Sequence, residues 1–240
     1  RTRSRELVIH DRQRLEIPYL LWATLYSFVI PLSGDITLFD AVVLFAIFFR
    51  YAASAARSES EEVHLVGRAA LIDREFGTAG RRLWAIAMFA YAGYAILVSA
   101  EPFADGLVEI GRTRDFDEFL LVQWVAPLAS ESPEFLIAIL FALRMRGSVG
   151  IGALISSKVN QWTLLVGAIP IAFGLSAGTL EGLPLDKRQT EELILTSTQS
   201  LLATIVVIDL RFSRAEAVLL ALLFGGQFLF TSTEVRYLFI

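Results

Sequence analysis

Long apolar runs with few or no charges alternate along this chain with short charged segments. A helix needs about 20 residues to cross the hydrocarbon core of a bilayer. The runs lack the strict alternation of barrel strands, so helices are the structure that satisfies their backbone inside the membrane. The pattern predicts an all-α polytopic membrane protein with about seven transmembrane helices, at residues 15–33, 36–49, 83–100, 119–143, 147–180, 193–208 and 215–233.

The first two runs are joined by the turn Pro-Leu-Ser-Gly-Asp at 31–35, which predicts a helical hairpin within residues 1–56. Residues 57–82 are polar and charged and form a long loop. Within it, the amphipathic stretch 63–72 fits a helix lying on the membrane surface and fits a solvated loop equally well. Residues 83–240 carry the remaining runs.

Lysine and arginine gather on one side of this topology. They precede the first run, fill the long loop and follow the fourth and sixth runs. The positive-inside rule places such segments in the cytoplasm. We therefore expect an integral membrane protein, in the plasma membrane, whose long loop is cytoplasmic.

The composition agrees with a membrane protein and narrows its chemistry. Hydrophobic residues make up 55% of the 240 positions, charged residues 19%, and the mean hydropathy is +0.59, which excludes a soluble enzyme. With no cysteine there is no disulfide, thiolate metal site or cysteine nucleophile. The two histidines lie in charged segments, and a net charge of −4 does not suggest nucleic acid as a partner.

The fourth run contains a polar segment with two prolines, Pro127 and Pro133. Proline cannot donate a backbone hydrogen bond, so the helix is expected to break at 127–134 and free carbonyl oxygens. Hydroxyls and carboxylates lie in the same segment, at Ser130, Ser132, Glu131 and Glu134. Together these oxygens suit a hard cation at membrane depth. The alternative is a kinked helix whose acids lie at a loop end near the outer surface.

Glu134 follows Pro133 directly and is therefore predicted to lie in the first turn of the resumed helix. The positive end of the helix dipole favours a carboxylate at this position. Glu134 is the residue most strongly indicated as a cation ligand.

A second polar island occupies 156–163 in the fifth run. At helical spacing Ser157 and Gln161 share one face, with Ser156 and Asn160 beside it. These hydroxyls and amides can face the broken helix. They can also serve as contacts between helices, since small residues allow membrane helices to approach closely.

Lys158 lies within this island and is the one charged residue of the run 147–180. A buried ammonium requires a partner or loses its proton. We expect it to pair with Glu131 or Glu134, where it would compensate charge, or to take part in proton coupling.

These motifs resemble those of the cation/calcium exchanger superfamily, which includes sodium/calcium and proton/calcium antiporters. Its members carry G-[ST]-S-x-P-E on one helix and G-S-N-x-x-N, with a later glycine, on the next. Here Ala-Ser-Glu-Ser-Pro-Glu at 129–134 is similar to the first, and Ser-Ser-Lys-Val-Asn-Gln at 156–161, with Gly167, to the second. The leading glycine of the first motif is alanine here, its serine is Glu131, and the central asparagine of the second is Lys158.

The resemblance implies an ion site in which each ligand corresponds to a motif position. Its ligands would be Glu134, Ser130, Ser157 and Gln161, with Asn160 in the asparagine role if the helix register differs by one residue. Glu131 and Lys158 are additional charged groups at this site. No cofactor is implied, since Ca²⁺ and Na⁺ or H⁺ are transported ligands.

The resemblance also implies a fold of ten helices in two inverted repeats. The chain would hold the last two helices of the first half in 1–56, the loop 57–82, and the second repeat in 83–240. It starts at Arg1 and stops inside an apolar run, so we expect part of a longer protein whose first α-repeat lies upstream. Its partners are then the lipid bilayer, metal cations and that missing half.

Three functions are compatible with these residues. The favoured one is a secondary antiporter that exchanges a cation, with Ca²⁺ the expected one, for Na⁺ or H⁺ by alternating access. The second is a non-transporting relative in which a Glu–Lys pair is structural. The third is a Ser–Lys membrane hydrolase, which is disfavoured because adjacent residues such as Ser157 and Lys158 do not face each other on a helix.

Overall fold

The computed structural model describes residues 6–9, 11–57, 68–114, 125 and 131–229. The chain divides into two compact units, one of residues 1–58 and 134–240 and one of residues 59–133. The described residues are mainly helical, with four short strands and the turns and loops that connect these elements. The described part of every predicted apolar run is mainly helical, which confirms the all-α polytopic membrane fold.

Two complete helices lie within the described part of the unit of residues 59–133. They are α4 (Arg68–Glu75) and α5 (Thr78–Arg114). Helix α4 overlaps the amphipathic stretch predicted at 63–72, whose first residues lie outside the described part. Helix α5 extends beyond the run 83–100 at both ends, from Thr78 to Arg114, and continues through Pro102 into a charged segment.

The larger unit begins with the elements that surround the first hairpin. They are β1 (Glu6–Val8), a 3₁₀ turn η1 (Asp11–Arg14), α1 (Glu16–Ser27), α2 (Ile30–Ser33), β2 (Asp35–Ile36) and α3 (Leu38–Arg57). The run predicted at 15–33 is split between α1 and α2. Pro31 lies in the first turn of α2, and its ring is incompatible with a helical carbonyl at Ser27, where α1 ends.

The second part of the larger unit begins within α7 (Ser132–Leu143), whose first two residues belong to the unit of residues 59–133. Its elements are α7, α8 (Gly147–Asn160), a π-helical turn η2 (Gln161–Leu165), α9 (Val166–Ala177), β3 (Leu183–Pro184), α10 (Lys187–Val207), β4 (Arg211–Ser213) and α11 (Arg214–Leu229). Helix α10 begins six residues before the predicted run because Asp186 caps it: Asp186 Oδ1 accepts from the Gln189 N–H at 2.7 Å, and Gln189 Oε1 accepts from the Asp186 N–H at 2.9 Å.

Within the described part of the chain, three helical stretches are both long and apolar enough to cross a membrane. They are Leu38–Arg57, Thr78–Thr113 and Gly147–Ala177. The last of these runs without interruption through α8, η2 and α9. Large apolar side chains such as Phe39 on α3 and Leu222 on α11 remain exposed, as expected for surfaces that face lipid.

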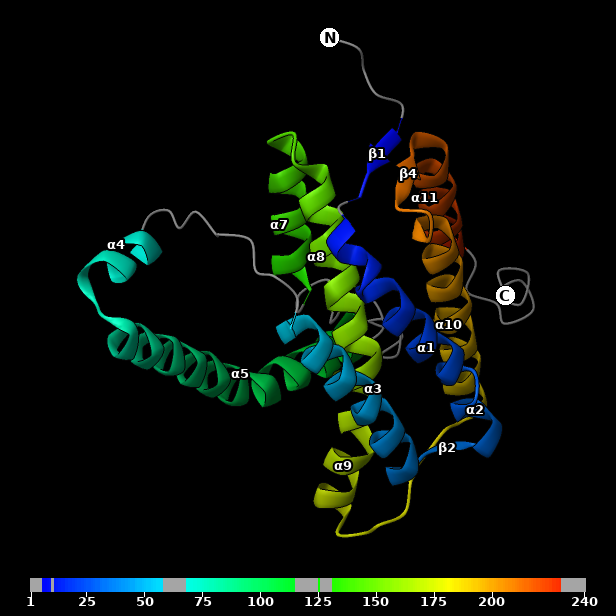
Figure 1. Cartoon of the computed structure of the whole chain (residues 1–240). Coiled ribbons are helices and arrows are strands. Elements are labelled where there is room, and N and C mark those ends of the chain that lie inside the picture. Colours follow the sequence, from blue (N-terminus) through cyan, green and yellow to red (C-terminus); the bar gives the residue numbers. More distant parts are fainter. Residues whose placement is uncertain (1–5, 10, 58–67, 115–124, 126–130, 230–240) are drawn as a thin grey trace. The chain divides into compact units, whose positions relative to one another are not determined.

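Helices α1, α8 and α10 pack side by side in the larger unit, and α9 lies against α3 (Figure 1). The main core lies between α1, α8, η2 and α10 and is formed by Ile9, Ile17, Leu20, Ala23, Ile155, Val159, Trp162, Val207 and Leu210. Two antiparallel strand pairs, β1 with β4 and β2 with β3, join connections far apart in sequence. This arrangement holds α8 and η2, which carry the second polar island.

Candidate cation site

Helix α7 begins inside the first polar segment. Its first residues are Ser132, Pro133 and Glu134, and proline fits here because the first turn of a helix needs no intrahelical donor. Glu134 lies in this first turn, as the sequence predicts. Its Oε2 is closed off from solvent and accepts no hydrogen bond within the described residues. A carboxylate oxygen in such a position is suited to a cation.

The remaining residues of the first motif are placed less completely. Glu131 lies in a bend before α7 and is half-buried, and Pro133 is exposed. Both belong to the unit of residues 59–133. Ser130 and Pro127 lie outside the described residues, so their predicted roles stay predictions.

Helices α7 and α8 approach each other closely enough to require a glycine. A Cβ atom on Gly150 would lie 2.9 Å from the carbonyl oxygen of Ala138. Glu134 is one turn before Ala138 on α7, and Ser157 is two turns after Gly150 on α8, so each shares the face of that contact. Helix geometry therefore directs Glu134 and Ser157 toward the sides on which the two helices meet.

Burial along α8 separates a packed face from a polar face. Gly152, Ile155 and Val159 are buried at intervals of three and four residues, which is the period of one helix face. Ser157 and Gln161 are half-buried, and Asn160 is exposed. These three members of the second polar island thus lie on the less covered side of the helix.

The helix changes its hydrogen-bond pattern where the island ends. Residues 161–165 form a π-helical turn in which the Val166 N–H donates to the carbonyl oxygen of Gln161, five residues back. Such turns inside an α-helix are frequent at functional sites. Gln161, predicted as a cation ligand, is the first residue of this turn.

Buried hydroxyls hold the π-helical turn against its neighbours. Trp162 Nε1 donates to Ser200 Oγ on α10 at 2.9 Å, and Ser200 Oγ is also 2.9 Å from Thr24 Oγ1 on α1. Thr163 bonds the carbonyl oxygen of Val159 at 2.6 Å. The Ser200 hydroxyl therefore joins the π-helical turn to α10 and α1.

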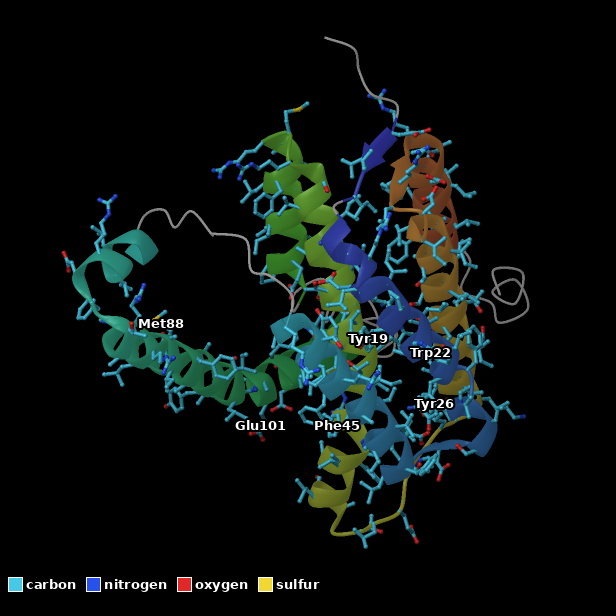
Figure 2. All side chains as sticks on the ribbon, viewed as in Figure 1. Tyr19, Trp22, Tyr26, Phe45, Met88 and Glu101 are labelled. Carbon is cyan, nitrogen blue, oxygen red and sulfur yellow. The ribbon has the colours of Figure 1, made fainter. Side chains whose placement is uncertain are left out.

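Gly167, the downstream glycine of the second motif, lies where α9 contacts α3. A Cβ atom there would lie 3.0 Å from Cε1 of Phe45 and 3.3 Å from Cβ of Leu44. Phe45 lies on α3 (Figure 2). Glycine at this position lets α9 pack directly on α3.

Lys158 lies on a different side of α8 from Ser156. Its Nζ is 5.7 Å from the centroid of the Trp162 ring, a cation–π distance. With Thr196, Gln199 and Ser200 of α10 and Leu223 of α11, it lines a cavity of about 270 Å³. The pairing of Lys158 with Glu131 or Glu134 stays a prediction.

The structure adds one acid that lies outside both sequence motifs. Glu16, at the start of α1, is only 9% exposed, and its Oε1 accepts a hydrogen bond from Ser156 Oγ at 2.5 Å. The available signal was a single acid at the edge of an otherwise apolar run. Ser156 therefore faces α1, whereas Ser157 points to another side of α8.

The described residues supply oxygen ligands without a complete metal site. No group of three or more histidine, cysteine, aspartate or glutamate side chains that could hold a metal ion occurs among them. A carboxylate at Glu134 together with hydroxyl and amide oxygens at 157–161 would be one side of a cation site.

Comparison with known proteins identifies the family of such a site. Residues 84–233 match the family model described as sodium/calcium exchanger protein. No curated protein matches the chain. Among solved structures, the H⁺/Ca²⁺ exchanger CAX is 49% identical and superposes with a TM-score of 0.92, over 98% of this chain and 60% of that one.

A more distant structure shows the same fold. The sodium-calcium exchanger NCX_Mj, in a crystal soaked with Na⁺ and Sr²⁺, is 18% identical, with a TM-score of 0.58 over 95% of this chain and 69% of that one. The chain thus spans about three fifths of the exchanger CAX.

Proposed function

Because the chain belongs to the sodium/calcium exchanger protein family, we propose that it forms part of a secondary antiporter that exchanges Ca²⁺ for H⁺ across the membrane. The observation that carries this proposal is the buried Oε2 of Glu134, which accepts no hydrogen bond within the described residues. Leaving a buried carboxylate oxygen unsatisfied is costly. A bound cation or a proton would satisfy it.

The proposed ligands come from both polar segments. Glu134 supplies the charge, Ser157 and Gln161 supply neutral oxygens, and Asn160 is the alternative amide. Ser130 and Glu131 complete the first motif. Because Ca²⁺ takes six to eight oxygen ligands, these side chains would form one side of the site, and the first α-repeat of the full-length protein would form the other.

Exchange follows from the chemistry of Glu134. An ionised carboxylate can ligate Ca²⁺, whereas a protonated one is a neutral hydrogen-bond donor with little affinity for it. Ca²⁺ and H⁺ therefore compete for the same oxygens. Alternation of the site between the two sides of the membrane, by movement of one helix bundle against another, would convert this competition into coupled transport.

The choice of H⁺ over Na⁺ as the coupling ion rests on likeness to a relative. The H⁺/Ca²⁺ exchanger CAX is 49% identical to this chain, whereas the likeness to NCX_Mj is one of fold. Lys158, in the place of the family asparagine, adds a positive charge that would occupy the position of a monovalent cation.

The surroundings of the transporter are proposed from the topology. The family and the apolar helices make the chain part of an integral membrane protein. The distribution of Lys and Arg supports a cytoplasmic location for residues 57–82, and the plasma membrane is the proposed compartment. Exchangers move Ca²⁺ as substrate and use no cofactor, and the family favours transport over the hydrolase alternative.

The test is Ca²⁺ uptake into proteoliposomes that contain the full-length protein. A pH gradient and a Na⁺ gradient are imposed separately. The expected result is uptake driven by the pH gradient and lost in Glu134→Gln, which cannot alternate between charged and protonated forms. Glu181→Gln, at an exposed position between α9 and α10, is the matched control and should retain wild-type uptake.

Two outcomes would contradict the proposal. Uptake driven by the Na⁺ gradient alone would show that Na⁺, and not H⁺, is the coupling ion. Full uptake in Glu134→Gln, with Ca²⁺ giving the same thermal stabilisation as in the wild type, would show that Glu134 is not a cation ligand.

A further inference from the structure

Glu16 is a buried carboxylate in contact with the helix that carries the second polar island. It lies in the first turn of α1, where the helix dipole favours a negative charge. Ser156 Oγ donates to Glu16 Oε1 at 2.5 Å, the length of a charge-assisted hydrogen bond between oxygens. Tyr51 of α3 donates to the same oxygen at 3.4 Å. Glu16 therefore joins α1, α3 and α8.

The contact with α1 continues along the same face of α8. Gly152 is one turn before Ser156, and a Cβ atom there would collide with the side-chain amide of Gln13, in η1. Val159, three residues after Ser156, is fully buried in the core. These residues define the side of α8 that rests on η1 and α1.

A second contact holds the other end of the island. Trp162 Nε1 donates to Ser200 Oγ, which lies 2.9 Å from Thr24 Oγ1. Residues 156 and 162 thus bracket the proposed ligands, and both contacts lead back to α1, at Glu16 and Thr24. The second polar island therefore packs against α1 at both of its ends.

The rotation of α8 determines which residues reach the cation. Successive residues on a helix are about 100° apart. When Ser156 points at Glu16, Ser157 and Gln161 must point to other sides, toward the face that meets α7 at Gly150. A modest rotation of α8 would turn Ser157 away from that face and bring another residue into its place.

We propose that Glu16 is a positioning residue of the exchanger: through Ser156 it sets the rotation of α8 and so directs Ser157 and Gln161 at the transported cation. The inference rests on the proposed function. It assigns to Glu16 no direct contact with the cation, only control of the ligands that make it.

The test compares variants that remove or keep the hydrogen bond. Ser156→Ala removes the donor, and Glu16→Leu removes the acceptor while keeping the size of the side chain. Glu16→Gln retains an oxygen that accepts from Ser156. Ser197→Ala is the matched control, because Ser197 of α10 accepts from Ser27 of α1 at 2.7 Å, a contact in which α8 takes no part.

The measurement is Ca²⁺ uptake by the full-length protein as a function of Ca²⁺ concentration. We expect Ser156→Ala and Glu16→Leu to raise the half-saturating concentration about tenfold, the effect expected when ligands are misaligned, while the maximal rate stays near that of the wild type. The double variant should be no worse than Glu16→Leu alone, because that substitution already removes the contact between Ser156 and Glu16. Glu16→Gln and Ser197→Ala should retain the wild-type half-saturating concentration.

The outcomes separate this inference from the proposed function. If the wild type takes up no Ca²⁺ under any gradient and Glu134→Gln changes nothing, the proposed function is wrong and the inference is withdrawn with it. If the wild type transports and Ser156→Ala keeps its half-saturating concentration, the positioning role is refuted and the antiporter stands. Loss of all uptake in Glu16→Gln would also overturn it, because the charge itself would then be needed. Ser156→Ala removes only one oxygen, so it decides the question even if Glu16→Leu does not fold.

Discussion

Replacing Gly150 with alanine tests whether the close approach of α7 and α8 sets the geometry of the cation site. The new Cβ would lie 2.9 Å from the Ala138 carbonyl oxygen and 3.2 Å from its Cα, whereas ordinary van der Waals contact begins at 3.4 Å. The atoms it meets belong to the backbone and cannot rotate away. The two helices must therefore separate by roughly half an ångström, since packed interiors have little free space.

The energetic cost can be isolated with a second glycine. Alanine gains about 0.5–1 kcal/mol over glycine within a helix, and this gain applies equally to Gly225→Ala, where nothing lies within 4 Å of the new atom. Overpacking costs about 1–3 kcal/mol. The difference in stability between Gly150→Ala and Gly225→Ala should therefore equal the overpacking term, about 1–3 kcal/mol.

Two assays report on this substitution. Thermal unfolding of the full-length protein in detergent should give a lower midpoint for Gly150→Ala than for Gly225→Ala. Ca²⁺ uptake should show a higher half-saturating concentration, because Glu134 and Ser157 lie on the faces that are pushed apart. If Gly150→Ala matches Gly225→Ala in both assays, the contact at Ala138 neither limits packing nor aligns the site.

Two further substitutions probe the surroundings of the island. Ser200→Ala removes the acceptor of Trp162 Nε1 and the partner of Thr24, and should lower the stability by about 1–2 kcal/mol in thermal unfolding. Thr198→Ala, whose hydroxyl bonds the carbonyl oxygen of Ile194 in its own helix, is the control, and equal midpoints for the two would contradict a stabilising role for the network. Lys158→Asn removes a positive charge close to the proposed ligands and should lower the half-saturating Ca²⁺ concentration by roughly a factor of ten. Lys187→Asn, at the exposed start of α10, should leave that concentration unchanged, and an unaltered value in Lys158→Asn would show that this ammonium does not act on the cation.

Local features of the sequence were enough to predict most helices of this protein. The hydrophobicity of a run is sufficient to predict that it lies in the membrane. Likewise, Pro133 and Glu134 predict the start of α7 without reference to any other segment. The ends of helices are harder to predict from the sequence, because they depend on individual contacts. The Asp186–Gln189 capping box extends α10 beyond its apolar run, and Pro31 divides the run 15–33 into two helices.

The chemistry of the site was likewise predictable only in part. The motifs at 129–134 and 156–161 indicated Glu134, Ser157 and Gln161 because their residue types and spacing are local properties of the chain. The resemblance to the exchangers rested on these same residues, and the family assignment confirms it.

The sequence by itself determined which segments enter the membrane and which oxygens are available to a cation, since hydrophobicity, helix period and proline geometry act over a few residues. The tertiary structure alone decided which way those oxygens point. Ser156 meets Glu16 across 140 positions and Thr24 meets Ser200 across 176, and nothing in either local segment specifies its partner. Hydrogen bonds of this kind depend on the packing of whole helices. For this reason the Glu16 carboxylate, at the start of α1, contacts the helix that carries the proposed ligands.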